Sequence, residues 1–561
     1  MRKNETNSLT WQLTGPGTGL LERAGIAALS MTLRAAEELR ADLSPLQWSE
    51  ADLTRQSVTI RSTDSLEAAL TKLFSFAWQV RDRVLYLPAI HRDWEASENS
   101  FMRVCAHNGI MRTFLQHPRV QPKGDLVEQI INLDEDRQIK IAYQSLDSAK
   151  LKPITDLAKA GFFGRDGTLA EKDVSLSGWV FPGIAPRYGP EVAWSGPAKA
   201  GLLLMLAPIV CMYQQLHSER STWLFVVPDV RDVEVFASVR LLPMFGLDPS
   251  YTDVASLGDA ALRFLAEYTS DPARRDLEAG CRVVAMGKVG YYQSQSIRKG
   301  VADVNATAKI CRRYRILNRV MMNRWMKRKP KSESAENAKA RKRKNEQPTN
   351  EARDFTSVPT GRGRIADNLM AARPWYLDLF QPLPWDWAAV ERQRKKQPGV
   401  STERLWFYNL LYQRGQLMEL IQEEEMWDNP EERLFVEAFW QVLAALYRRE
   451  ADAVERGGSR TFGDRIEDLN EDIRRCLTRA KTRPLLRQAI IDLFARPVEK
   501  YRSPVVRQRP DLVWHLIDDD WKRSRDLALL ALASYQSKEK REAGLKTDEQ
   551  TESPETEGVD A

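Results

Sequence analysis

The spacing of apolar residues divides the chain into a mixed first part and a helical second part. Short runs rich in β-branched and aromatic residues predict strands over residues 10–14, 84–87, 138–143, 222–227 and 282–293. Apolar residues at helical spacing predict helices over 20–39 and 65–78. Because strands and helices do not alternate regularly, we expect an irregular α+β body over residues 1–326.

After residue 370, apolar residues at positions i, i+3 and i+4 predict an all-α bundle that extends to residue 536. Its helices are expected over 401–426, 430–454, 464–481, 483–495 and 511–535, with short connections. Residues 327–369 hold almost no large apolar side chain, so we expect a disordered basic linker there. Residues 537–561 hold eight acids and four bases and are expected to form a disordered acidic tail.

The sequence predicts neither a secretory signal nor a membrane span. The N-terminus has no apolar core of the kind that signal peptides carry. The most apolar stretch, residues 200–213, contains Pro208 and is shorter than the roughly 20 apolar residues of a spanning helix. We expect it to be a buried, kinked helix, and we expect the protein to be cytoplasmic, without a membrane partner.

Positive charge is concentrated near the end of the predicted body. The 561 residues include 83 basic and 77 acidic side chains, a formal net charge of +6. Residues 309–344 alone hold 15 bases and two acids, so the rest of the chain is net acidic. Such a segment attracts anions and predicts either nucleic acid or an anionic surface as a partner.

Residues that would support catalysis or metal binding do not cluster along the chain. The five cysteines form no CxxC pair, and the five histidines show no HxH or HxxxH spacing. His515 precedes three aspartates at 518–520, but a solvated helix face explains that run better than a metal site does. We therefore expect no catalytic group, no metal and no cofactor.

A glycine-rich loop at residues 15–19 lies between a predicted strand and a predicted helix. Backbone N–H groups at such a place can hold a phosphate. The loop reads GPGTG and lacks both the GK[ST] of a P-loop and the spacing of a dinucleotide-binding loop. A structural turn is favoured, and a cradle for an RNA phosphate stays open as the alternative.

Residues 286–300, MGKVGYYQSQSIRKG, combine residue types that contact nucleic acid. Glycines allow close backbone approach, tyrosines stack on bases, glutamines reach base edges and cations bind phosphates. A surface hairpin with incidental charge is the alternative. The residues expected to contact or open DNA here are Lys288, Tyr291, Tyr292, Gln293 and Gln295, with Arg298 and Lys299 on phosphates.

Three further groups of cations are candidate contacts with nucleic acid. A basic amphipathic helix over 309–326 carries Arg312, Arg313, Arg315 and Arg319, for which membrane docking is the alternative. Two glycine-rich loops supply Arg165 and Lys199. A stripe in the bundle consists of Arg474, Arg475, Arg479, Lys481, Arg483 and Arg487, whose alternative is a solvated face paired with Asp468, Glu471 and Asp472.

Three segments resemble the large subunit of type I CRISPR Cascade complexes, in the branch first described from myxobacterial-type loci. They read WQLTGPGTGLLERAGIAAL, GPAKAGLLLMLAPIVCMYQQLHSERSTWLFVVPDVRDVEVF and GKVGYYQSQSIRKG. The likeness covers about residues 10–320. Residues 375–536 are similar to the C-terminal bundle of such subunits, which itself resembles the Cascade small subunit.

The resemblance implies a non-catalytic subunit of an RNA-guided DNA surveillance complex. Such subunits contact the 5′ handle of the guide RNA, recognise the PAM in duplex DNA and help to open it for R-loop formation. The implied partners are the guide RNA, target double-stranded DNA, the backbone, handle-binding and small subunits, and a helicase-nuclease or transposition machinery. A stand-alone DNA-binding regulator or transposition-associated protein is the main alternative, and a divergent metal nuclease comes after it. Internal translation from Met370, Met418 or Met426 would release all or part of the bundle as a small subunit.

Overall fold

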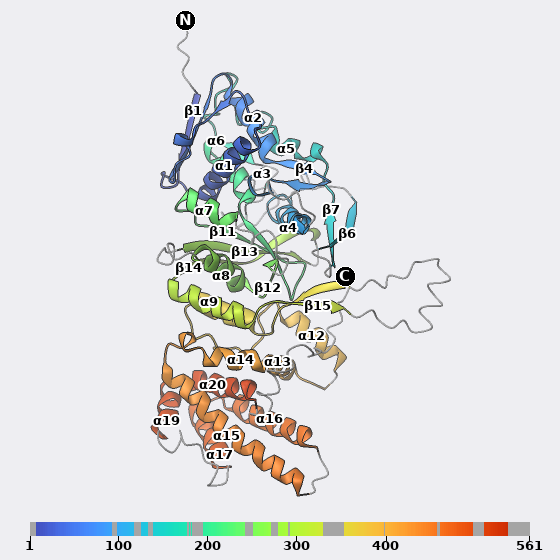
Figure 1. Cartoon of the computed structure of the whole chain (residues 1–561), viewed down its shortest axis with the longest axis vertical. Helices are drawn as coiled ribbons and strands as arrows, with labels where there is room; N and C mark the ends of the chain where they lie inside the picture. Colours follow the sequence, from blue (N-terminus) through green and yellow to red (C-terminus); the bar gives the residue numbers. More distant parts are fainter. Residues whose placement is uncertain are drawn as a thin grey trace, which may run out of the picture. The chain divides into compact units, whose positions relative to one another are not determined.

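The computed structural model divides into two compact units, and the chain crosses between them more than once (Figure 1). The body unit comprises Met1–Cys311 and Asn323–Val358, and the helical unit comprises Arg312–Met322 and Pro359–Ala561. The structure describes residues 7–91, 98–116, 125–132, 138–176, 179, 181, 194–241, 251–270, 279–289, 292–328, 353–397, 399–456, 461–496 and 510–536. The predicted α+β body and the predicted all-helical second part are confirmed.

A mixed sheet in the order β12-β10-β11-β13-β14 forms the centre of the body unit. β10 and β12 are parallel, and the other neighbours are antiparallel. Every residue of β11 is buried, so both faces of the sheet are covered at that strand. The strands are β10 (Met212–Leu216), β11 (Trp223–Pro228), β12 (Asp253–Val254), β13 (Ala279–Val289) and β14 (Tyr292–Ala306), and α4 (Glu98–Thr113) and α8 (Leu257–Tyr268) pack against them.

The first helix, α1 (Leu20–Glu38), packs closely on α6 (Ala198–Leu206). A Cβ on Gly25 would stand 2.2 Å from the carbonyl oxygen of Leu203, so only glycine fits at this crossing. The predicted helix over 200–213 is buried as expected, but α6 ends at Leu206. A 3₁₀ turn containing Pro208 follows, and β10 then begins.

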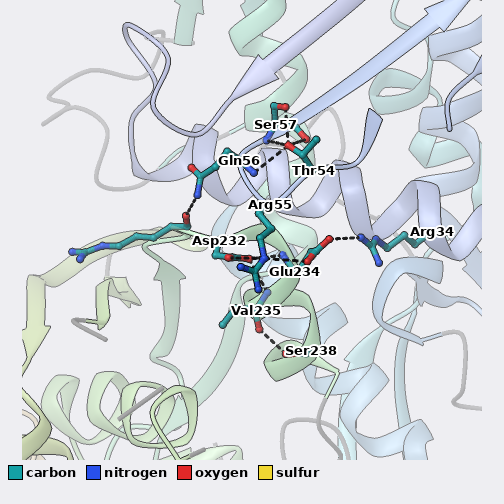
Figure 2. A network of polar contacts seen from close by, with 10 residues as sticks. Arg34, Thr54, Arg55, Gln56, Ser57, Asp232, Glu234, Val235 and Ser238 are labelled. Atoms are coloured by element: carbon teal, nitrogen blue, oxygen red, sulfur yellow. Dashed lines mark hydrogen bonds and ion pairs between the residues drawn. The ribbon is translucent and has the colours of Figure 1, made fainter. Parts of the chain in front are cut away.

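A polar network ties a three-stranded N-terminal sheet to α7 (Val233–Arg240) within the body unit. Figure 2 shows Arg55, next to the start of β3, between two carboxylates: its Nε lies 3.4 Å from Asp232 and 3.3 Å from Glu234. Asp232 also accepts the backbone N–H groups of Glu234 and Val235 and so caps α7. This sheet pairs β1 (Asn7–Gln12) and β2 (Leu46–Gln47) with β3 (Ser57–Ser62).

The ends of the predicted linker are regular structure. β15 (Arg324–Arg328) pairs with β16 (Arg353–Ser357), and Trp325 packs against an apolar cluster that includes Phe101 and Ile131. Residues 329–352 therefore connect two paired strands of the body unit, although they lie outside the described residues. The linker prediction missed this pairing because RWMKR and RDFTS have no continuous apolar run. The remaining body elements are α2 (Leu66–Ala77), α3 (Pro88–His91), α5 (Lys152–Thr155), β4 (Gln79–Arg81), β5 (Val84–Tyr86), β6 (Leu126–Asn132), β7 (Gln138–Gln144), β8 (Val174–Leu176) and β9 (Trp194–Gly196).

The helical unit is arranged around α20 (Trp521–Ser534), which packs against α14, α15, α16 and α19 (Figure 1). Most residues of α20 are buried. Two predicted helices are each divided in the structure. Residues 401–426 form α13, α14 and a 3₁₀ turn, and residues 511–535 are interrupted at Asp520, whose side chain caps α20. The other helices are α11 (Arg362–Met370), α12 (Trp387–Lys396), α13 (Thr402–Leu411), α14 (Arg414–Gln422), α15 (Pro430–Glu455), α16 (Phe462–Arg479), α17 (Arg483–Ala495) and α19 (Pro510–Asp519).

The unit boundaries differ from the predicted boundaries at residues 326 and 369. α9 (Ala308–Val320) comes long before the bundle in sequence, yet from Arg312 onward it belongs to the helical unit. α11 also begins before residue 370 and extends that unit toward the N-terminus. The predicted acidic tail, residues 537–561, lies outside the described residues.

Candidate nucleic-acid interface

The predicted segment 286–300 forms the outer end of the β13–β14 hairpin. β11 pairs with β13 only as far as Met286, whereas β13 continues to Val289 and β14 begins at Tyr292. The hairpin therefore runs beyond the end of β11 as a two-stranded ribbon. The backbones of Lys288, Tyr292, Gln293 and Gln295 lie on this ribbon, but their side chains and the whole of Tyr291 lie outside the described residues.

The two cations on this hairpin have different surroundings. Arg298 lies opposite Met286 and is exposed, with no ion pair in the described part of the chain. Lys299 is the extra residue of a β-bulge, and its Nζ forms an ion pair with Glu219 of the β10–β11 turn. Among the described residues, Lys299 therefore has a carboxylate partner and Arg298 has none.

Three of the arginines of α9, Arg312, Arg313 and Arg319, contact acidic residues of the helical unit. Arg313 is 6% exposed, and its Nη1 and Nη2 lie 3.0 and 2.9 Å from the two carboxylate oxygens of Asp428. Its Nε donates to the backbone oxygen of Glu425, at 2.6 Å. Arg312 and Arg319 are more exposed than Arg313. They form ion pairs with Glu425 and Glu423, respectively. A phosphate that bound Arg313 would have to displace Asp428.

A buried arginine that the sequence reasoning missed completes this contact. Arg362 begins α11 and is 0% exposed. Its guanidinium donates to the backbone oxygen of Met321, to the hydroxyl of Tyr314 at 3.0 Å and to Asn318 Oδ1 at 2.8 Å. Arg362 and the acids at 423–428 together hold α9 in the helical unit. The acidic stretch at 423–428 was the available signal for the ion pairs of α9, although Glu424 within it binds Arg433 instead.

The predicted stripe on α16 and α17 is divided by its ion pairs. Glu471 binds both Arg474, which is buried, and Arg475, with N–O distances of 2.8 Å. Arg487 lies 3.1 Å from Asp518 and over the ring of Trp514. Of the acids named in the solvated-face alternative, Glu471 pairs with Arg474 and Arg475, whereas Arg474 is buried and Arg487 pairs with Asp518 instead. Exposed stripe members with no ion pair in the described ranges are Arg479, Lys481 and Arg483.

α12 is an exposed basic helix that the sequence reasoning did not single out. Val390 is its one buried residue, and Trp387 at its start is 45% exposed. Arg392, Arg394 and Lys395 are exposed, although Arg394 pairs with Glu391 of the same helix. The run RQRKK was the available signal. An exposed aromatic ring and exposed cations are residue types that bind single-stranded nucleic acid, and α12 carries both.

The glycine-rich loops supply exposed cations at Arg165 and Lys199. Arg165 is exposed in a turn, and Lys199 lies near the start of α6 with its Nζ 5.8 Å from the ring centroid of Trp11. In the loop at residues 15–19, Gly19 is the N-cap of α1. A carboxylate oxygen of Glu22 lies 2.7 Å from the place of a Cβ on Gly19, so a negative charge already occupies this helix start. This geometry favours the structural turn.

Several buried histidine and cysteine side chains of the body unit are held in their neutral forms. His107 accepts the backbone N–H of Leu85 through Nδ1, and its Nε2 lies 2.9 Å from the backbone oxygen of Gln144. Burial lowers the pKa of His107 to about 4, so the ring is neutral at pH 7. Burial also raises the pKa of the thiols of Cys105, Cys211 and Cys281, which disfavours the reactive thiolate.

The described residues contain no group of three or more His, Cys, Asp or Glu side chains placed to hold a metal ion. A cavity of about 40 Å³ lies beside Cys105, Tyr213, Arg240 and Arg263, which is room for a few water molecules. No helix within the described ranges is long and apolar enough to span a bilayer.

The sequence matches known proteins across both units. Residues 10–205 match the DevT N-terminal domain, and residues 422–560 match the DevT C-terminal domain. The CRISPR-associated protein Cas8a1/Csx13 of Myxococcus xanthus (strain DK1622) is 24% identical over 553 residues, which cover 94% of this chain and 89% of that protein. The chain therefore belongs to the large subunits of type I CRISPR Cascade complexes, in the myxobacterial branch, which act in CRISPR defence together with other Cascade subunits and nucleic acids.

Proposed function

We propose that this large subunit recognises the PAM in duplex DNA with the outer end of the β13–β14 hairpin. The observation that carries the proposal is the register: β13 and β14 stay paired beyond the last residue that β11 contacts. A two-stranded ribbon of this kind fits a DNA groove. Its sequence supplies stacking rings, base-edge amides and cations, and Arg298 has no carboxylate partner among the described residues.

The subunit also helps to open the duplex and contacts the 5′ handle of the guide RNA. Unstacking a base step costs a few kcal/mol, which contacts between protein and DNA must offset. Sequence is then read by pairing with the guide, so the subunit needs no catalytic group for its role. The handle and the other Cascade subunits are the partners expected for the body unit, whose exposed cations include Arg165 and Lys199.

The helical unit holds the displaced strand in this proposal. Exposed cations without ion pairs in the described ranges are present at Arg479, Lys481 and Arg483. α12 carries the exposed Trp387 together with exposed cations, of which Arg394 pairs with Glu391. Phosphates bind the cations, and bases stack on the exposed ring. A helicase-nuclease or a transposition machinery is the partner that would act on the opened DNA.

The test uses the complex assembled with its guide RNA and compares targets with and without the PAM. The variant Lys288→Ala/Gln293→Ala/Gln295→Ala is expected to reduce the preference for PAM-containing DNA by about tenfold or more, since one good base contact supplies roughly 1–3 kcal/mol. Lys140→Ala, in the β6–β7 hairpin of the same unit, is the matched control. Unchanged PAM preference in the triple variant would contradict the proposal.

The same preparations distinguish the alternative functions. A stand-alone regulator would bind DNA with equal affinity in the absence of guide RNA, and it would not co-purify with that RNA. A metal nuclease would cleave DNA when Mg²⁺ or Mn²⁺ is added to the isolated protein. We expect guide-dependent binding and no cleavage by this subunit alone.

A further inference from the structure

The β13–β14 hairpin contains a bulge immediately before its outer end. Ala285 pairs with Gly300, but Met286 pairs with Arg298, so Lys299 has no partner across the strands. A bulge of this kind bends the ribbon and increases its twist, and it therefore sets the direction in which the outer end points. The residues that stabilise the bulge therefore affect the direction of the ribbon beyond Met286.

The side chain of Lys299 crosses over Gly287 to reach Glu219. A Cβ on Gly287 would stand 2.4 Å from Cε of Lys299 and 2.5 Å from Oγ1 of Thr222, so this path requires glycine. Both charged groups are half-buried, with side chains 25% and 29% exposed. Glu219 is itself held in the β10–β11 turn, where its backbone oxygen accepts the N–H of Thr222 at 2.8 Å.

We propose that Lys299 and Glu219 are positioning residues that aim the β13–β14 hairpin at DNA, with Gly287 as the gap that lets them meet. This inference rests on the proposed PAM-recognition function and adds how the recognising element is held. It assigns Lys299 a role inside the protein, in place of the phosphate contact that its charge suggests. The β10–β11 turn thereby becomes part of the DNA-recognition apparatus without touching DNA.

Two variants separate positioning from phosphate binding. Glu219→Gln and Lys299→Met each remove the ion pair but keep the shape of the side chain. If the pair positions the hairpin, each variant lowers the ratio of PAM to non-PAM affinity by about fivefold, the scale of a partly buried ion pair. The double variant is then no worse than either single variant, because both remove one interaction. The charge exchange Glu219→Lys/Lys299→Glu restores most of the ratio.

A phosphate contact gives a different pattern. Lys299→Met would weaken binding to all DNA alike and reduce the salt dependence of log K by about 0.9, while Glu219→Gln would not weaken binding. That pattern would overturn the inference. Arg298→Met is the reference variant for it, because Arg298 is an exposed cation on the same strand with no described ion pair.

A second pair on the same two strands is the matched control. Arg282 and Asp303 form an exposed ion pair near the base of the hairpin, where β11 flanks β13. Arg282→Met/Asp303→Asn is expected to leave the PAM ratio unchanged.

Amide hydrogen exchange of residues 286–300, measured in the complex without DNA, tests whether the ion pair holds the hairpin in place, independently of PAM recognition. Faster exchange there in Glu219→Gln and Lys299→Met supports positioning, even if the wild-type complex shows no PAM preference. Unchanged exchange together with an unchanged PAM ratio would refute it.

Discussion

Replacement of Arg362 by methionine tests whether α9 is an integral part of the helical unit. The side chain is 0% exposed and donates to Tyr314, Asn318 and the backbone oxygen of Met321. Methionine has a similar length but no donor, so three acceptors on or beside α9 lose their partner. Each buried acceptor left unsatisfied costs about 1–3 kcal/mol, and half-buried Asn318 regains water, which gives a total of roughly 3–5 kcal/mol.

Native-state hydrogen exchange followed by mass spectrometry measures this loss locally. A cost of about 3 kcal/mol corresponds to a hundredfold faster exchange of α9 amides, since roughly 1.4 kcal/mol changes an equilibrium tenfold. Arg364→Met in the same helix removes donors only to Gln381 and Pro382 and is the control. Equal exchange of residues 312–322 in Arg362→Met and Arg364→Met would refute the idea that α9 is held by Arg362.

Three further predictions follow from other sites. Gly25→Ala is expected to destabilise the body unit by about 1–3 kcal/mol in denaturant unfolding, because the added Cβ overlaps the carbonyl of Leu203. Gly17→Ala is the comparison: its Cβ would meet no atom within 4 Å, but its φ is +76°, so backbone strain alone should cost about 1 kcal/mol. His107 has a pKa of about 4 in the folded state, so below pH 6.5 its ring takes up a proton on unfolding, and the free energy of unfolding should fall by about 3 kcal/mol between pH 6.5 and pH 4. His107→Gln keeps a hydrogen-bond donor and an acceptor and should flatten this pH dependence, and an unchanged pH dependence of stability would contradict the low pKa of His107. The unpaired cations of the stripe are tested by Arg479→Gln, Lys481→Gln and Arg483→Gln. Each should reduce the slope of log K against log salt concentration for binding to single-stranded DNA by up to about 0.7, whereas Arg475→Gln, which removes a cation already paired with Glu471, should change that slope little.

The internal-start prediction has a structural consequence. A fragment that begins at Met370 would lack α9 and nearly all of α11, and with them Arg313 and Arg362. The acids at 423–428 would then lose the arginines that they contact in the full chain. Mass spectrometry of the purified complex would show whether such a fragment exists.

Local patterns predicted much of the secondary structure because each depends on nearby residues. α17 was predicted with its observed bounds, and α15 was predicted to within one residue at its C-terminal end. The sequence analysis missed that residues 511–535 form two helices, because the apolar periodicity continues across Asp520. The interruption depends on a single side chain, that of Asp520, which caps α20. The β15–β16 pairing was missed because its strands are polar and 24 residues apart in sequence.

Candidate contacts were harder to predict, since a sequence shows charge but not its partners. Arg312 and Arg313 were assigned to nucleic acid because they lie in a basic run, yet in the folded chain each contacts a carboxylate more than 110 residues away. Arg362 was passed over within the predicted linker and is one of the most enclosed side chains in the helical unit.

By itself, the sequence determined the composition of each part: where apolar periodicity is helical, where charge is concentrated and which segments resemble a Cascade large subunit. Tertiary structure decided which cations remain exposed without a carboxylate partner, because ion pairs between distant segments neutralise some and burial encloses others. It left Arg298, Arg479, Lys481 and Arg483 exposed and unpaired among the described residues, and it turned Lys299 toward Glu219. The physical reason is that electrostatic partnership depends on distance in space, whereas the sequence records only distance along the chain.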